Sequence, residues 1–233
     1  MAHELSYELH GDDFQSVSLS LDPGEGVCAE PGSMMWMETG VQMSTSTQGG
    51  VLKGLKRALS GESFFLTTFT NEGADAATVA FAADYPGKIL PLDLSRGTVL
   101  CQRSAYLCSA QGIDISVALT RKMGAGFFGG EGYILQRLSG DGVAFVHAGG
   151  HIIERRLHAT DTLRVDTGCI VGFEESVEYS IELVKGFATK LFGGEGLFHA
   201  TLRGPGTVWL QTTPFSRFAD RVIGASMRRR RAA

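Results

Sequence analysis

A glycine-rich phrase occurs twice in this chain, and its spacing limits the fold more than any other feature. Residues 127–138 read FFGGEGYILQRL, and residues 191–202 read LFGGEGLFHATL. The two Gly-Gly-Glu phrases begin at positions 129 and 193, and the offset between them also takes Phe145 to Trp209. Because an offset that stays constant along a chain indicates duplication of a structural unit, we expect internal repeats.

A third, fainter copy of the phrase lies upstream. The sequence SGESFFL begins at position 60 and corresponds to GGEGYIL, which begins at position 129. Three units therefore follow one another, at about residues 14–80, 81–147 and 148–214. Since each unit is short, we expect all three to pack into one domain.

The segments around the repeated phrase have the composition of β-strands. They mix alternating polarity with β-branched and aromatic residues, and clusters of Gly, Pro, Asn and Asp separate them. The clearest segments are FFLTTFT (64–70), DISVAL (114–119), YILQRL (133–138), GVAFVHA (142–148), VEYSIEL (177–183) and TVWLQT (207–212).

Three such units predict an all-β fold, because a strand unit that cannot bury its apolar face alone must pack against its neighbours. We expect a double-stranded β-helix or β-sandwich with pseudo-threefold symmetry, forming a single β domain over residues 1–214. Residues 215–233 are expected to form a short C-terminal helix and a basic tail, because apolar residues recur there at helical spacing ahead of four arginines. A second helical period lies at 51–59.

Further phrases carry a resemblance to a known family. They are EPGSMMWM (30–37), YPGKILPLDL (85–94) and GPGTVWLQT (204–212), in addition to the repeated Gly-Gly-Glu. With these phrases in this order, the chain resembles bacterial relatives of the altered-inheritance-of-mitochondria family over about residues 10–214. The resemblance implies a fold like that of the tryptophan RNA-binding attenuation protein. It implies no particular activity, although mitochondrial relatives are associated with inner-membrane organisation.

The repeated phrases are the candidate interaction loops. Glycine allows close backbone approach, and a glutamate after glycine can hold a sharp turn by accepting hydrogen bonds from backbone amides. Two other interpretations stay open: the three glutamates converge on a cation, or the loops contact a partner. The candidate residues are Gly61, Glu62, Phe127, Phe128, Gly129, Gly130, Glu131, Phe192, Gly193, Gly194 and Glu195.

Basic residues stand beside large apolar residues just before each phrase, as in TRKMGAGFFGG (120–130) and KGFATKLFGG (185–194). Buried apolar residues here would be ordinary strand packing, whereas an exposed apolar patch with a basic rim marks a protein or membrane-surface partner. Strand edges left unpaired at unit ends are often covered by a second copy, so we expect a homo-oligomer. The sequence therefore favours a non-catalytic β-scaffold that self-assembles and presents its loops to such a partner.

A small-ligand-binding module is the second hypothesis. Trp36 and Trp209, with Met34, Met35 and Met37, can line a cavity for an apolar or carbohydrate ligand. Tryptophan and methionine are also common core residues, and a core position is the simpler interpretation of all five.

A metal-dependent β-barrel enzyme is the third hypothesis, and it rests on His147 and His151 alone. These histidines flank a turn and would face each other if their strands were paired. The chain contains no nucleophile elbow of the form GxSxG and no phosphate-binding P-loop, so we expect no catalytic residue and no cofactor.

Composition excludes some partners and suggests a location. The formal net charge is −4, which predicts no general affinity for nucleic acid. No apolar run approaches the ~18 residues that span a bilayer, and the first residues are too polar for a targeting signal. The four cysteines have apolar flanks and no zinc-site spacing, which is typical of buried thiols in a cytoplasmic protein.

Overall fold

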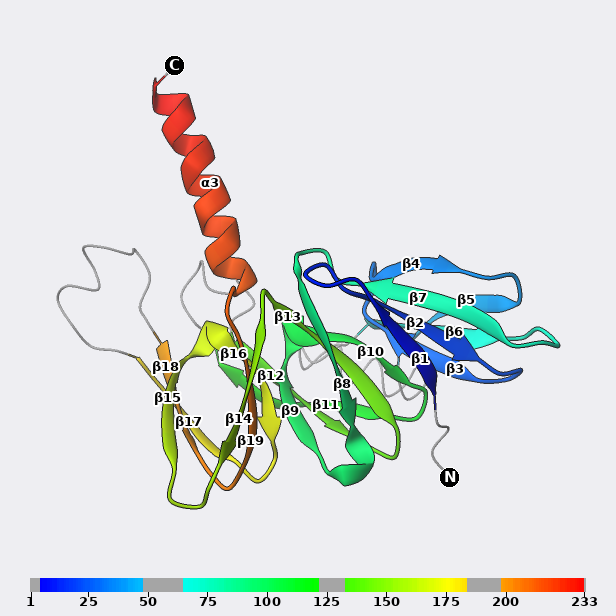
Figure 1. Ribbon diagram of the computed structural model, residues 1–233, viewed down its shortest axis with the longest axis horizontal. Coiled ribbons are helices and arrows are strands. Elements are labelled where there is room, and N and C mark those ends of the chain that lie inside the picture. Colours follow the sequence, from blue (N-terminus) through cyan, green and yellow to red (C-terminus); the bar gives the residue numbers. More distant parts are fainter. Residues whose placement is uncertain (1–4, 48–64, 122–132, 184–197, 233) are drawn as a thin grey trace.

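The protein is mostly β, with one helix at the C-terminal end of the described chain (Figure 1). The computed structural model describes residues 5–47, 65–121, 133–183 and 198–232. Its strands form antiparallel sheets that follow one another along the longest axis of the molecule. The predicted all-β class with a C-terminal helix is confirmed, while the helical period at 51–59 lies outside the described residues.

The first two sheets contain most of the N-terminal half of the chain, together with β13 (Val143–Gly149). The first has the strand order β1-β2-β7-β4, with β1 Ser6–His10, β2 Ser16–Leu21, β7 Ala77–Ala82 and β4 Met34–Met37. The second has the order β5-β6-β3-β10-β13-β8, with β5 Val41–Thr47, β6 Phe65–Asn71, β3 Gly26–Ala29, β10 Tyr106–Ala110, β13 Val143–Gly149 and β8 Gly87–Asp93.

The other two sheets contain most of the C-terminal half. The third has the order β11-β12-β9-β16-β19-β14, with β11 Asp114–Arg121, β12 Tyr133–Ser139, β9 Val99–Gln102, β16 Ile170–Glu174, β19 Gly206–Gln211 and β14 Ile152–Leu157. The fourth has the order β15-β18-β17, with β15 Thr162–Asp166, β18 Phe198–Arg203 and β17 Glu178–Leu183. All six segments that the sequence predicts as strands are confirmed as strands.

Burial along the strands follows their place in the sheets. Strand β2 (SVSLSL) alternates buried Val and Leu with half-buried Ser, as expected because successive side chains of a strand point to opposite faces. Strands β3 and β10 are buried at every position, because both lie inside the second sheet and are covered on both faces.

One pairing scheme occurs in three successive groups of six strands, β2–β7, β8–β13 and β14–β19. In each group the last strand lies between the first and the third, as β7 lies between β2 and β4. The fifth strand lies between the fourth and the second, as β6 lies between β5 and β3. Two junctions then join the groups, because β3 also pairs with β10 and β9 also pairs with β16. Each six-stranded sheet is therefore made of strands from two groups.

Two clusters of buried side chains form the core. The larger cluster fills the first two groups, where the rings of Phe69 and Phe81 meet edge to face with their centroids 5.2 Å apart. The smaller cluster lies mainly in the third group and also includes Leu100, Tyr133 and Leu135 of the second. In this cluster Phe173 packs against Tyr179 at a centroid distance of 5.2 Å. Aromatic pairs at such distances add about 1 kcal/mol to the gain from burial of their area.

The C-terminal helix α3 (Phe215–Ala232) leaves the body beside the third group (Figure 1). Its first turn is held by an ion pair of 2.7 Å between Arg217 and Asp166, and by the ring of Phe215, whose centroid lies 5.0 Å from that of Tyr85. Further along, Val222 is 54% exposed. Within the described residues no helix combines the length and the apolar character that crossing a membrane requires.

Candidate functional site

The interaction loops predicted from the sequence lie outside the described residues. These are Gly61, Glu62, Phe127, Phe128, Gly129, Gly130, Glu131, Phe192, Gly193, Gly194 and Glu195. In chain order the three segments that contain them join β5 to β6, β11 to β12 and β17 to β18. Each segment thus joins the fourth strand of a group to the fifth, and the role of these loops stays a prediction.

The structure does not bring His147 and His151 together on paired strands. His147 lies on β13, whose partners are β8 and β10, whereas His151 precedes β14, which pairs with β19. His147 is buried, and its ring meets that of Tyr85 edge to face with a centroid distance of 4.5 Å. Among the described residues, no group of three or more His, Cys, Asp or Glu side chains could hold a metal ion.

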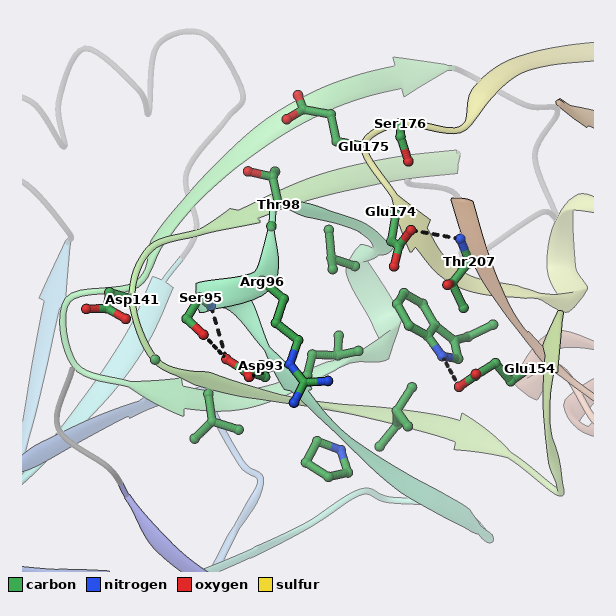
Figure 2. Close-up of a pocket in the computed structure, with 18 of the residues that line it drawn as sticks. Asp93, Ser95, Arg96, Thr98, Asp141, Glu154, Glu174, Glu175, Ser176 and Thr207 are labelled. Carbon is green, nitrogen blue, oxygen red and sulfur yellow. Dashed lines mark hydrogen bonds and ion pairs between the residues drawn. The ribbon is translucent and has the colours of Figure 1, made fainter. Parts of the chain in front are cut away.

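A cleft of about 980 Å³ lies where the chain passes from the second sheet to the third (Figure 2). Strand β8 ends on one side of it, and the 3-10 helix η1 (Leu94–Arg96) carries the chain across to β9. Strands β14, β16 and β19 supply the opposite side, and Leu5 and Tyr7 from the N-terminal segment complete the lining. The cleft is thus built from segments that are far apart in sequence.

Asp93 organises the first wall of the cleft. Its Oδ1 accepts hydrogen bonds from the backbone N–H of Ser95 at 3.1 Å and from the Ser95 hydroxyl at 2.5 Å. Its Oδ2 accepts a hydrogen bond of 2.8 Å from Nε of Arg96. These donors, the Ser95 hydroxyl first among them, hold the pKa of Asp93 below its ordinary value. Asp93 is therefore a fixed carboxylate at the mouth of the cleft.

Two glutamates from different strands stand on the opposite wall (Figure 2). Oε2 of Glu154 accepts a hydrogen bond of 3.0 Å from the indole Nε1 of Trp209, and Oε2 of Glu174 accepts one of 2.9 Å from the backbone N–H of Thr207. A third acid on this side, Glu175, forms an ion pair with Arg137. Each carboxylate is oriented by a donor from the protein itself.

The cleft has an acidic lining. Five carboxylates border it, and Arg96 is the one lysine or arginine among its described lining residues. The carboxylates are those of Asp93, Asp141, Glu154, Glu174 and Glu175. Carboxylate oxygens accept hydrogen bonds and attract cations, so the cleft suits a small molecule rich in hydroxyl or ammonium groups. The sequence did not reveal this cleft, because its acids are scattered along the chain from position 93 to position 175.

The tryptophans and methionines of the small-ligand hypothesis do not share one site. Trp209 lines the cleft and is 9% exposed, so it is a core residue with one edge on the cleft. Met35, Trp36 and Met37 lie on β4 in the first sheet, and none of them lines the cleft. Their expected core position is wrong, because they are 55%, 44% and 40% exposed.

We call Met35, Trp36 and Met37 the β4 patch. In the other two groups the strands equivalent to β4 are β10 and β16, and their corresponding bulge residues are Leu107 and Val171. Leu107 is 2% exposed and Val171 is 0% exposed, whereas Met35 of the patch is 55% exposed. The bulge residue of the third strand is thus buried in the second and third groups, whereas in the first group it is exposed as part of the β4 patch.

Comparisons with known proteins give the family of this chain. Residues 7–213 match the family described as mitochondrial biogenesis AIM24. An uncharacterised protein of Streptococcus pyogenes serotype M6 is 27% identical over 214 residues, which cover 88% of this chain and 84% of that protein. A crystal structure of a Streptococcus pyogenes protein from a structural genomics programme superposes with a TM-score of 0.78, covering 95% of this chain and all of that one. Its identity is 24%, so this last likeness shows the fold alone.

Proposed function

The chain belongs to the mitochondrial biogenesis AIM24 family, as the resemblance in its sequence predicts, and we propose that it is a self-assembling β-scaffold. In this proposal three repeated units form one domain, copies of the chain associate with one another, and the assembly presents the Gly-Gly-Glu loops to a protein or membrane-surface partner. The free cysteines suit the reducing cytoplasm that we propose as its location.

The strand pairing supports the proposed repeats. The three groups share one pairing scheme, and the predicted unit boundaries after residues 80 and 147 fall just before the ends of β7 and β13. Pairing would place the boundaries slightly later, after Ala82 and Gly149, because the last strand of a group belongs with its first.

The observation that carries the proposed self-assembly is the β4 patch. Three large apolar side chains stand in a row on a strand that pairs with β7 alone in the described structure. Burial of one such side chain stabilises an interface by about 1.5–3 kcal/mol, and a cluster of them on a monomer marks an interaction site. A protein contact that buries this patch would give the first group the burial that the other two already have.

Self-assembly can be tested by changing the patch. We expect the wild-type protein to be an oligomer in size-exclusion chromatography with light scattering and in native mass spectrometry. The double variant Trp36→Ser, Met37→Ser should dissociate at concentrations at least about tenfold higher than the wild type, since about 1.4 kcal/mol corresponds to a factor of ten. Met43→Ser is the matched control, because Met43 is also 55% exposed but lies on β5.

The loops need a separate test, because they lie outside the described residues. If they contact a membrane surface, Phe127→Ser with Phe128→Ser should lower binding to anionic liposomes while the melting temperature and the oligomer size stay at wild-type values. Unchanged liposome binding would remove the membrane surface from the proposal and leave a protein partner.

The acidic cleft favours a second candidate function, the binding of a small polar molecule. The variant Trp36→Phe leaves Trp209, which lines the cleft, as the single tryptophan of the chain. A titration with spermidine as a cationic probe, and with maltotriose as a hydroxyl-rich probe, should give a saturable change in its fluorescence with one of them. No change with either probe at millimolar concentration would count against this function.

A further inference from the structure

We propose that copies of this chain associate head to tail by strand pairing, with the free edge of β4 in one copy against the free edge of β15 in the next. The proposal rests on the self-assembly proposed above, and it adds which surfaces meet and in which register. It is argued from the two junctions inside the chain, where the same kinds of strand already meet.

Among the described strands, the third strand of the first group has one neighbour, and the third strands of the other two groups have two each. Strand β10 pairs with β13 and with β3, and β16 pairs with β19 and with β9. In the described structure β4 pairs with β7 alone. The unpaired edge of β4 therefore offers backbone donors and acceptors. The same edge of β10 is paired with β3 of the preceding group, and that of β16 is paired with β9.

The second strand of a group shows the opposite pattern. Strand β3 lies between β6 and β10, and β9 lies between β12 and β16. At the other end of the chain, β15 pairs with β18 alone among the described strands. The edge of β15 that corresponds to the paired edges of β3 and β9 is thus unpaired in the described structure. The unpaired edges of β4 and β15 are therefore of the two kinds that pair with each other inside the chain.

One chain cannot join these two edges to each other. Along the longest axis of the molecule, β4 lies at one end and β15 at the other (Figure 1). A second copy can supply the missing neighbour at each end without any change in the fold. An interface of this kind uses different surfaces on the two copies, and it extends into a closed ring or an open filament.

The internal junctions give the register of the contact. In the first junction, Cys108 faces Ala29 and Ser109 faces Cys28. In the second, Gly172 faces Cys101, and the next pair along the strands is Phe173 with Leu100.

Corresponding positions in β4 follow from pairing within each group. After the bulge of β4, Trp36 faces Ala80. After the bulges of β10 and β16, Cys108 faces Phe145 and Gly172 faces Trp209. Trp36 is therefore the counterpart of Cys108 and Gly172 on the third strands.

Corresponding positions in β15 follow from the repeat offset. Val99 pairs with Leu138, and Leu163 pairs with Leu202. The second pair follows the first at the same offset that separates the Gly-Gly-Glu phrases at positions 129 and 193. By the same offset, Val165 on β15 is the counterpart of Cys101 on β9.

The transferred register places Trp36 opposite Val165 and Met37 opposite Arg164. Trp36, Met37 and Arg164 are exposed in the single chain, whereas Val165 is 8% exposed and belongs to the smaller core cluster. The indole of Trp36 would meet an apolar partner, and the methylene stem of Arg164 would cover Met37 while its guanidinium stays in water. Two of the three exposed side chains of the β4 patch would thereby be covered.

Cysteine crosslinking tests the register directly. The double variant Met37→Cys, Arg164→Cys should form a ladder of covalent multimers on mild oxidation, seen on a non-reducing gel. A mixture of the two single variants should form covalent dimers and no larger species, because each chain then carries one reactive end. The parent protein gives the background, since three of its four cysteines are buried and Cys169 is half-buried.

A shifted pair is the matched control. Thr162 lies two positions from Arg164 on the same face of β15, so Met37→Cys with Thr162→Cys should give at least about tenfold less covalent dimer. The register is overturned if the protein is an oligomer and the 37–164 pair does not crosslink, or if Met37→Cys crosslinks alone, which would mean that two β4 strands meet. A protein that stays monomeric in light scattering overturns the proposed self-assembly as well.

Discussion

The indole Nε1 of Trp209 donates a 3.0 Å hydrogen bond to Oε2 of Glu154, the residue directly opposite it on the neighbouring strand. Trp209 is 9% exposed, whereas Glu154 is exposed, so the hydrogen bond between them is half-buried at the edge of the cleft. The pair joins β14 to β19 and also forms part of the wall of the acidic cleft.

Removal of the carboxylate should therefore destabilise the third group. We expect Glu154→Ala to lower the free energy of unfolding by about 0.5–1.5 kcal/mol, the net contribution of one hydrogen bond. Glu154→Gln keeps an acceptor and should lose less than half as much. Urea denaturation followed by tryptophan fluorescence measures both variants, and equal losses would contradict the hydrogen bond as the cause.

Asn71 is fully buried at the end of β6 and is expected to be the most sensitive polar residue of the first group. Its Nδ2 donates to the carbonyl oxygens of Leu21 at 2.8 Å and Asp75 at 2.9 Å, and its Oδ1 accepts from the N–H of Gly73 at 2.9 Å. Asn71→Ala should cost about 3 kcal/mol, because it leaves three backbone groups without partners. The neighbour Glu72 offers the control: Glu72→Ala should change stability by less than about 0.5 kcal/mol in the same denaturation experiment.

His147 should make the protein sensitive to mild acid. Burial lowers the pKa of its imidazole from 6.5 to about 4, so the folded protein resists a proton that the unfolded chain accepts. Above the unfolded pKa neither state is protonated and His147 adds no pH dependence. As the pH falls from 6.5 towards 4, the free energy of unfolding should decrease by about 2–3 kcal/mol and then level off.

The contribution of His147 can be isolated by substitution. His147→Phe retains an aromatic ring beside Tyr85 and removes the titrating group. The difference in stability between wild type and variant should therefore change across pH 4–6.5 and stay constant above it. A difference that is constant over the whole range would show that the titration lies elsewhere.

The thiols should be poorly reactive in the folded protein. Burial raises the pKa of Cys101 to about 12 and raises that of Cys108 as well, while Cys28 is 5% exposed. Cys169 is half-buried, and burial is also the main reason that its pKa is raised. With a colorimetric disulfide reagent, we expect one slow thiol in the native state, lost in Cys169→Ser, and four in guanidinium chloride. Rapid reaction of more than one native thiol would contradict the core packing.

Local sequence was enough to predict the strands but not their neighbours. Segments such as YILQRL and TVWLQT are confirmed as strands, since alternation and β-branched residues act over a few positions. The pairing of β3 with β10 brings Cys28 opposite Ser109, and no local pattern specifies a contact so distant in sequence. The β4 patch shows the consequence: composition placed Trp36 in the core, but its side chain is 44% exposed, and β4 pairs with β7 alone in the described structure.

The candidate cleft was beyond the reach of sequence for a similar reason. Asp93, Glu154 and Glu174 are ordinary acids in their own segments, and only the packing of β8, β14 and β16 brings them to one cleft. Conversely, the most conspicuous phrase in the sequence, the repeated Gly-Gly-Glu, lies outside the described residues.

The pairing of first and last strands also sets an order of events during synthesis. Strand β7 must emerge before β2 can pair with it, and β13 must emerge before β8 can pair with it, so each group closes only when its final strand has been made. At the junctions between groups, the partner strand has been made well before it is needed. Strand β3 is already present when β10 emerges, and β9 is already present when β16 emerges. A chain made from its N-terminus therefore provides each new group with a finished edge on which to grow, and folding can follow translation one group at a time.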